Sequence, residues 1–123
     1  MAFLTDRKRV SGLGSARSGT GHHWTMTVTS IALLILTPFF LGIIGTGLGS
    51  EHGDVIALLS RPIPALVVAA YLIVGSHHLR LGMQIMIEDY THGMTRKAAI
   101  ILSTILCYGI ALGGLVALIQ IAL

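Results

Sequence analysis

The chain has 123 residues, of which 54% are hydrophobic and only 11% are charged. Soluble domains carry about 25% charged residues, so this composition excludes an ordinary soluble domain and indicates that lipid surrounds most of the chain. The formal net charge is +3, but no basic patch is interleaved with aromatic residues, which argues against nucleic-acid binding.

The first 23 residues differ from the rest, because they are polar, basic and rich in glycine and serine. Four basic residues stand there against one acidic residue, Asp6. A long Gly/Ser stretch separates these charges from the first apolar run, and no clear cleavage site follows, so this segment is not a secretory signal peptide. We expect residues 1–23 to form a cytoplasmic N-terminal arm that is flexible or bound to a partner.

Three long stretches of the chain contain no Asp, Glu, Lys or Arg. They lie between Arg17 and Glu51, between Arg61 and Arg80, and after Lys97. A spanning helix needs roughly 20 apolar residues, and these stretches are apolar all round, without the polar stripe of a soluble helix. The sequence therefore predicts an all-α integral membrane protein with one three-helix domain over 24–122, with transmembrane helices at about 24–48, 63–88 and 95–122.

The first predicted helix opens on Trp24, which suits a membrane interface, and contains Pro38, which predicts a kink. In the loop that follows, "DVIALLS" is typical of a short interfacial helix. Pro62 and Pro64 suit the first turn of the second spanning helix. In the third helix, the glycines at 109, 113 and 114 form a small-residue pattern that predicts tight helix packing.

Basic residues near the helix ends predict the orientation, because they concentrate on the cytoplasmic side. The N-terminal arm has four such residues and the second loop has Arg96 and Lys97, whereas the first loop has only Arg61 and the C-terminus has none. The arm and the second loop should therefore lie in the cytoplasm, and the first loop and the C-terminus on the opposite side. The single cysteine, Cys107, excludes a disulfide framework within the chain.

The second predicted helix concentrates polar residues in "SHHLRLGMQIMIEDY". A charged residue at the bilayer centre costs about 2.5–3.5 kcal/mol on insertion scales, so such residues face a partner, a cavity or a cofactor. At 100° per residue, Asp89 returns to within about 20° of His78, about 16 Å further along the axis, and Gly82 lies on the same face. This stripe could line a planar cofactor, because neutral imidazole is an axial ligand of haem iron. A histidine that only forms a hydrogen bond across helices is the simpler alternative.

Other polar residues have less specific interpretations. His77 competes with His78 as a ligand, although the spacing to Gly82 and Asp89 favours His78. Gln84 is expected to form a hydrogen bond to a neighbouring helix, and Arg80 could extend towards the membrane surface. An interface anchor is expected from His22, His23 and Trp24, with a role at the mouth of a binding site as the alternative. His52 is expected to be solvated, and His92 to be a loop histidine that could alternatively aid proton transfer.

The motif "HHLRLGMQIMIEDYTHG" resembles the signature of the smaller hydrophobic membrane anchor of succinate dehydrogenase, respiratory complex II. That pattern is a histidine, three residues, a glycine, six residues and then Asp-Tyr, which gives His78, Gly82, Asp89 and Tyr90 without a gap. The segment "GLGSARSGTGHHW" before the first helix is similar to alphaproteobacterial members. The resemblance covers most of the chain, including the layout of three helices.

The resemblance implies an anchor subunit of succinate:ubiquinone oxidoreductase in the bacterial inner membrane. His78 would be one axial ligand of a haem b shared with the larger cytochrome b anchor subunit, with which this chain packs into a helical bundle. Tyr90 would donate a hydrogen bond to ubiquinone, and Asp89 would lie at the quinone site and help to deliver protons. The iron–sulfur and flavoprotein subunits would be the other partners. The chain would not be catalytic alone, since it carries no flavin or iron–sulfur motif.

One departure from the family pattern is visible at the start of the first helix. Many members carry an arginine shortly after the opening aromatic residue, but "HHWTMTVTS" has threonines and no arginine. Arg80 could replace it near the haem propionates or the quinone. Two alternatives remain open: a fumarate reductase anchor, and a non-redox membrane subunit, such as a transporter component or assembly factor, whose polar cluster relays protons or ions.

Overall fold

The structure is a computed structural model that describes residues 4–12 and 19–122. In these residues it contains helices and no strand: α1 (Asp6–Ser11), α2 (Gly19–Gly47), α3 (His52–Leu59), α4 (Pro62–Tyr90) and α5 (Gly93–Ala122). The helices α2, α4 and α5 are long and apolar enough to cross a membrane. The prediction of an all-α membrane protein with three transmembrane helices is therefore confirmed.

The helix boundaries follow local chemistry that hydropathy does not report. The helix α2 begins at Gly19 rather than at Trp24, so the end of the predicted arm is already helical. The helix α4 begins with Pro62 in its first turn, where the missing N–H of proline has no helical partner to lose. Gly93, with φ 61°, opens α5 in the left-handed region, which glycine adopts without steric cost. Residues 13–18 of the predicted arm lie outside the described part of the chain.

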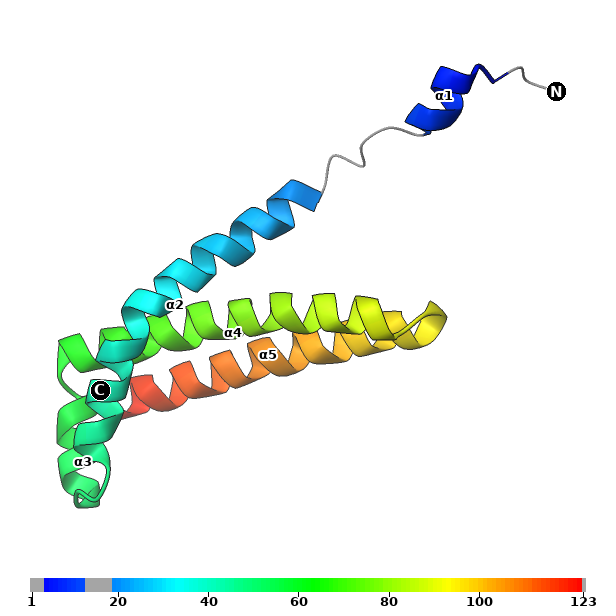
Figure 1. Cartoon of the computed structure of the whole chain (residues 1–123). Coiled ribbons are helices and arrows are strands. Elements are labelled where there is room, and N and C mark those ends of the chain that lie inside the picture. Colours follow the sequence, from blue (N-terminus) through cyan, green and yellow to red (C-terminus); the bar gives the residue numbers. More distant parts are fainter. Residues whose placement is uncertain (1–3, 13–18, 123) are drawn as a thin grey trace.

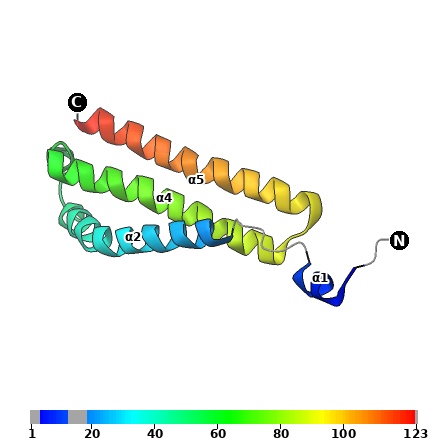
Figure 2. The ribbon, with the colours of Figure 1, turned by 90° about the horizontal axis from the view of Figure 1, so that it is seen from above.

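The three long helices form a single layer with α4 in the middle. Within the described residues, α2 and α5 each pack against α4 and do not contact each other. Figure 2 shows α2 and α5 on opposite sides of α4, and Figure 1 shows that the N-terminal half of α2 diverges from the other two helices. In the C-terminal half of α4, contacts with α2 therefore occur near His78 and Gly82, and the end of the helix at Asp89 and Tyr90 is exposed.

Small side chains form the contact of α5 with α4. The buried residues of α5 are Ser103, Cys107, Ala111 and Leu118, and their spacing places them on one side of the helix. Gly114 completes this row, because a Cβ atom at Gly114 would lie 3.0 Å from Cδ1 of Leu72 in α4. A Cβ atom at Gly109 or Gly113 would meet nothing within 4 Å. Of the predicted glycine pattern, only Gly114 thus makes a close contact within the chain.

We expect Gly114→Leu to destabilise the contact between α4 and α5 by about 1–3 kcal/mol, because the added atoms overlap Leu72 and force both helices to shift. The measurement is the thermal midpoint of the purified protein in detergent. Gly109→Leu is the matched control, because a side chain at that position enters open space. An equal loss of stability in both variants would contradict the assigned contact.

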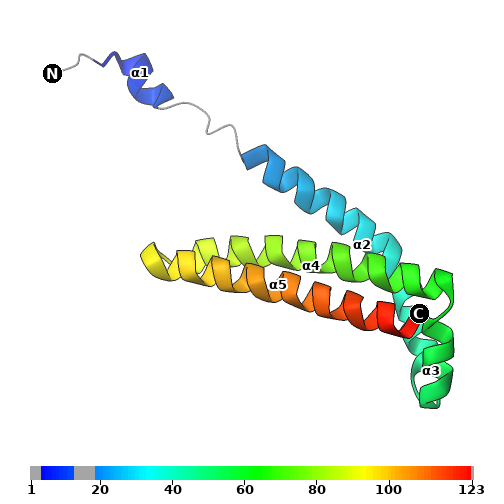
Figure 3. The same ribbon diagram turned by 180° about the vertical axis from the view of Figure 1, so that it is seen from behind.

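The helix α2 is bent, and it contacts α4 on both sides of the bend. Figures 1 and 3 show that α2 changes direction in its second half, which contains Pro38. Proline lacks the N–H that would bond to the carbonyl four residues earlier and thereby bends a helix, so the predicted kink is present. Just after the bend, the rings of Phe40 and Tyr71 stack with centroids 4.0 Å apart. Before it, Leu33 packs over Gly75.

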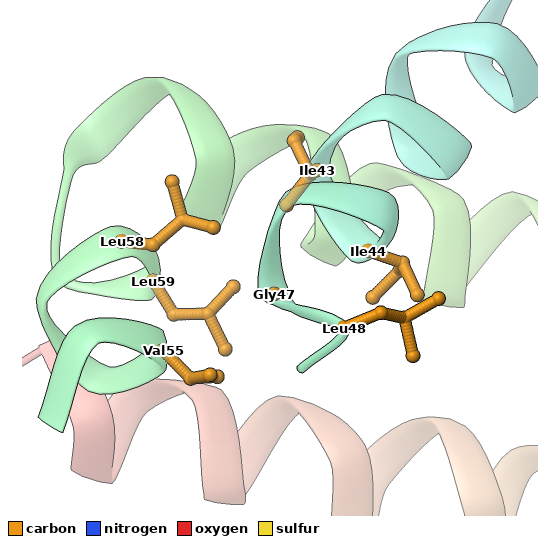
Figure 4. Close-up of a pocket in the computed structure, with 7 residues that line it drawn as sticks. All are labelled: Ile43, Ile44, Gly47, Leu48, Val55, Leu58 and Leu59. Atoms are coloured by element: carbon orange, nitrogen blue, oxygen red, sulfur yellow. The ribbon is translucent and has the colours of Figure 1, made fainter. Parts of the chain in front are cut away.

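The short helix α3 confirms the helix expected in the first loop. It packs against the end of α2, where a Cβ atom at Gly47 would lie 3.7 Å from Cγ2 of Val55. Figure 4 shows Leu58 and Leu59 facing Ile43 across a pocket of about 200 Å³. The pocket is lined by aliphatic side chains and Gly47. It lies at the opposite end of α4 from the polar stretch and has no side chain that could act as a ligand or an acid–base group.

Candidate functional site

The polar residues of α4 separate onto two sides of the helix. Adjacent residues differ by about 100° around a helix, so the two neighbouring histidines meet different helices. The imidazole of His78 contacts Thr29 of α2, whereas that of His77 contacts Tyr108 of α5. The two histidines that sequence spacing could not fully separate thus have different surroundings.

The side chain of His78 is half-buried and held by one hydrogen bond. Its Nδ1 lies 2.9 Å from Oγ1 of Thr29. The same threonine oxygen lies 2.9 Å from the carbonyl oxygen of Thr25 and 3.0 Å from that of Met26, to which its O–H donates. No hydrogen bond involves Nε2 of His78 in the described part of the chain, so this nitrogen is available to a ligand.

A groove of about 320 Å³ lies beside His78. Leu33 contributes from α2, and the rest of the lining comes from α4: Tyr71, Leu72, Gly75, Ser76, His78 and Leu79. Pockets that bury a small molecule hold about 300–1,000 Å³, so this groove alone is too small to enclose a large cofactor. Any such cofactor needs walls from a second protein chain.

The stripe of His78, Gly82 and Asp89 faces α2 for part of its length. A Cβ atom at Gly82 would lie 4.0 Å from Cε of Met26, so the methionine covers the glycine. Asp89 is exposed at the end of α4. The predicted alignment on one face is present, but within this chain a methionine side chain occupies the space at Gly82 that was expected for a flat ring.

On the other side of α4, His77 borders a second groove, of about 460 Å³. Its Nδ1 lies 3.0 Å from the hydroxyl oxygen of Tyr108. Apart from these two side chains the lining is aliphatic, made up of Ile73, Ala111, Leu112 and Leu115. The His77 side is therefore a polar pair set in an apolar groove between α4 and α5.

Three buried polar atoms in this half of the protein have no hydrogen-bond partner in the described residues: Nε2 of His22, Nε of Arg80 and Oε1 of Gln84. An unsatisfied buried polar group costs about 1–3 kcal/mol. Arg80 also has no ion-pair partner, since the one ion pair of the described residues joins Arg9 and Asp6.

Gln84 corrects one expectation. Its Nε2 donates to Oε1 of Glu88 at 2.8 Å, so its partner lies one turn further along the same helix and not on a neighbouring helix. Glutamine and glutamate four residues apart are close on a helix surface, which makes this contact available without any packing partner. The orphaned Oε1 of Gln84 is left for another molecule.

The end of α4 presents two exposed polar side chains. Tyr90 is the last residue of α4 and is 83% exposed, and Asp89 beside it is exposed as well. Twelve residues separate Tyr90 from His78, which corresponds to about 18 Å along the helix axis. The candidate residues thus lie at two separate locations: His78 within the membrane span, and Asp89 and Tyr90 at the end of α4.

Arg96 of α5 holds this mouth together. Its Nε donates to the carbonyl oxygen of Thr91 at 2.8 Å, and an Nη donates to that of Glu88 at 2.8 Å. These bonds satisfy carbonyl groups that the end of a helix leaves without partners. The sequence indicated Arg96 only as an orientation signal, so its capping role was missed.

Thr29 and Tyr108 were also missed as partners of the two histidines. Thr29 is one of several hydroxyl residues in the first half of α2, so no pattern in the sequence singled it out. Of the other predicted candidates, only His92 lies near the mouth in the described residues, two positions after Tyr90. His23 and Trp24 are exposed on α2, His52 is exposed at the start of α3, and His92 is exposed between α4 and α5. No three His, Cys, Asp or Glu side chains come together to hold a metal ion anywhere in 4–12 or 19–122.

Comparisons with known proteins agree on one family. The family described as "Succinate dehydrogenase/Fumarate reductase transmembrane subunit" matches residues 2–117. The chain is 44% identical to a succinate dehydrogenase hydrophobic membrane anchor subunit of Paracoccus denitrificans, over 100% of this chain and 95% of that protein. It is 33% identical to the subunit of the same name from Rickettsia bellii, over 72% of this chain and 70% of the relative. No solved structure gave a significant match.

Proposed function

Since the chain belongs to the succinate dehydrogenase membrane anchor family, we propose that it helps to bind haem b and to form the ubiquinone reduction site of a succinate:ubiquinone oxidoreductase. The observation that carries this proposal is the unpartnered Nε2 of His78 beside an open groove of α4. Electrons from succinate oxidation would reach ubiquinone at the membrane through the complex that this chain anchors.

The residues present fit a shared haem b. A protein supplies haem iron with axial ligands only, and a neutral imidazole nitrogen is a suitable one. Haem binding therefore does not require a cluster of several metal ligands, and the described residues contain none. The groove beside His78 is open and of about 320 Å³, as expected when a second chain provides the other wall and the other axial ligand. When bound, the haem supplies a one-electron redox centre within the membrane.

The surroundings of the two histidines favour His78 over His77 as the iron ligand. In the described residues Nε2 of neither histidine has a hydrogen-bond partner, but Nδ1 of His78 contacts a threonine hydroxyl that also contacts two backbone carbonyl oxygens of α2. His77 lies opposite the hydroxyl of Tyr108, in an apolar groove between two helices of the same chain. We therefore assign iron ligation to His78 and a packing role to His77.

The exposed end of α4 suits the quinone. Reduction of ubiquinone to ubiquinol takes up two electrons and two protons. The hydroxyl of Tyr90 would donate a hydrogen bond to a quinone carbonyl oxygen, which attracts charge towards that oxygen as electrons arrive. Asp89, in contact with water, would pass protons to the reduced oxygens. The exposure of both side chains leaves them free for a substrate and for the iron–sulfur subunit.

Arg80 remains the cation proposed for a haem propionate or for the quinone. Its buried Nε has no partner in the described residues, and an unbalanced cation within a membrane attracts an anionic or carbonyl group. Its position differs by about 200° from that of His78 around α4, so Arg80 would reach such a group from the other side of the helix.

The proposed assembly is complex II of a bacterial inner membrane, with the larger cytochrome b anchor, the iron–sulfur subunit and the flavoprotein as partners. The N-terminal segment and the loop between α4 and α5 would face the cytoplasm, because most basic residues near helix ends lie there. Asp89 and Tyr90 then lie at the cytoplasmic surface, where the iron–sulfur subunit would bind. The C-terminus would lie in the periplasm.

The proposal predicts that this chain, tagged and purified from its native membrane under mild detergent, brings with it a haem b spectrum and a flavin-bearing protein. The preparation should oxidise succinate and reduce a ubiquinone analogue. A colourless preparation that lacks both haem and flavin would contradict the proposal and favour a non-redox subunit. Faster fumarate reduction by a menaquinol analogue than ubiquinone reduction would favour a fumarate reductase anchor instead.

A further inference from the structure

Thr29 is the one side chain of α2 that forms a hydrogen bond with a histidine of α4 in the described residues. Its Oγ1 makes three close contacts: 2.9 Å to Nδ1 of His78, 2.9 Å to the carbonyl oxygen of Thr25 and 3.0 Å to that of Met26. A threonine hydroxyl has one proton to donate and two lone pairs that accept. The two carbonyl oxygens can only accept, so the hydroxyl proton is directed to them.

The direction of the third contact follows. In the arrangement that satisfies all three contacts, the proton of Thr29 goes to the backbone, its oxygen accepts from His78, and Nδ1 of His78 carries the hydrogen; the opposite tautomer would leave both oxygen–oxygen contacts without a hydrogen. In a neutral imidazole one nitrogen carries the hydrogen and the other has the lone pair. The lone pair of His78 is therefore on Nε2, the nitrogen with no partner in the described part of the chain.

We propose that Thr29 is a positioning residue that fixes both the tautomer and the ring orientation of His78 for coordination through Nε2. This inference rests on the proposed ligation of haem by His78 and adds to it the residue that prepares the ligand. A hydrogen bond from the distal nitrogen of a ligating histidine orients the ring and raises its basicity. Here the acceptor is a threonine oxygen that the backbone of α2 orients.

The contact of His77 lacks this directionality. The hydroxyl of Tyr108 lies 3.0 Å from Nδ1 of His77, and it makes no second hydrogen bond in the described residues. The tyrosine can donate its proton to Nδ1, which would place the hydrogen of His77 on Nε2 and block coordination there. The structure thus prepares one histidine for a metal and leaves its neighbour undetermined.

The proposal also gives a role to a threonine in the segment where many family members have an arginine. The hydroxyls of Thr25 and Thr27 donate to backbone carbonyl oxygens one turn earlier, and in the described residues neither forms a hydrogen bond with a histidine side chain. Thr29 makes the same kind of backbone bond but lies on the side that faces α4. Thr27 differs from Thr29 by about 200° around α2 and so points away from α4, whereas Thr25 lies within about 40° of Thr29 but about 6 Å nearer the start of the helix, where α2 diverges from α4 (Figure 1).

The test is Thr29→Val in the purified complex, with three readouts of the haem: its content, its electron paramagnetic resonance spectrum in the ferric state and its midpoint potential. Loss of the acceptor makes the imidazole a poorer electron donor, so the ferric state is stabilised less. We expect a higher midpoint potential, altered g values, and haem affinity lower by about 10-fold or more, the typical effect of removing the outer partner of a ligating histidine.

Two further variants keep this test decisive. Thr29→Ser retains the hydroxyl and should keep the wild-type spectrum and potential. Thr27→Val makes the same substitution two residues earlier, where the hydroxyl contacts only the carbonyl oxygen of His23, and should also leave both unchanged. A Thr29→Val complex with wild-type spectrum and potential would overturn the proposal, as would a Thr29→Ser complex that loses them or a Thr27→Val complex that shifts as much as Thr29→Val.

Failure of this inference differs from failure of the proposed function. If His78→Ala removes the haem signal while Thr29→Val changes nothing, His78 is a ligand and Thr29 does not position it. If His78→Ala leaves the haem signal intact, the assignment of the ligand itself is wrong and the role of Thr29 falls with it.

Discussion

Replacement of His78 by alanine is expected to abolish the absorption bands of low-spin haem b in the purified complex. The imidazole of His78 has a free Nε2 beside a groove, with Nδ1 held at 2.9 Å from Thr29. Alanine removes the one side-chain nitrogen that the described residues offer at the groove, and haem held by one remaining axial ligand would be lost or become five-coordinate. The measurement is the reduced-minus-oxidised difference spectrum, normalised to the flavin content.

His77→Ala is the matched control for this experiment. It removes an identical side chain one residue away, together with its hydrogen bond to Tyr108, and should leave the haem spectrum in place. Loss of the spectrum in His77→Ala and its survival in His78→Ala would reverse the assignment. Equal loss in both variants would indicate that α4 does not fold without either imidazole. The further variant His78→Gln then decides, because glutamine keeps a polar side chain of similar reach. The ligand assignment stands only if His78→Gln also loses the haem spectrum.

The second large effect is expected for Tyr90→Phe, which should lower the rate of ubiquinone reduction by about tenfold or more. The side chain of Tyr90 is 83% exposed at the end of α4, where its hydroxyl can donate to a quinone carbonyl oxygen. A hydrogen bond to a group that gains charge contributes about 1.5–3 kcal/mol, which corresponds to a factor of about 10–150 in rate. The measurement is succinate-driven reduction of a soluble ubiquinone analogue.

The same preparation should oxidise succinate with an artificial dye at the wild-type rate, because the dye accepts electrons before they reach the membrane. Tyr108→Phe is the control, since it removes a tyrosine hydroxyl at the packing contact with His77, a residue about 20 Å from Tyr90 along the axis of α4. If Tyr90→Phe slowed quinone and dye reduction equally, the effect would lie in assembly and the role of Tyr90 at the quinone would be refuted.

The spanning helices could be predicted from the distribution of charge, because a bilayer excludes charged groups over a length that the sequence makes visible. The start of α2 could not. Residues Gly19–His23 continue the helix beyond the apolar stretch, and hydropathy carries no information about a helix that extends past the membrane. The short helix α3 was predictable because its apolar residues recur within a polar loop.

For the candidate site too, some features could be predicted from the sequence and others could not. Helical geometry alone placed His78, Gly82 and Asp89 on one side of α4, since an angle of 100° per residue requires no knowledge of packing. The partners of that side belong to another helix, and no pattern within α4 reports that Met26 covers Gly82 or that Thr29 reaches His78. The glycines of α5 show the same limit, because the close contact at Gly114 depends on where Leu72 lies.

The placement of α4 between α2 and α5 has a consequence for biogenesis. In the described residues each spanning helix packs only against the spanning helix before or after it in the chain, and elements that are neighbours in the chain pair faster than distant ones. We expect α2 and α4 to pair as soon as both have entered the bilayer, with α5 joining last. The pair of Thr29 and His78 would then exist before the chain is complete, and the side of α4 left open would allow the haem and the second anchor subunit to arrive afterwards, from within the membrane plane.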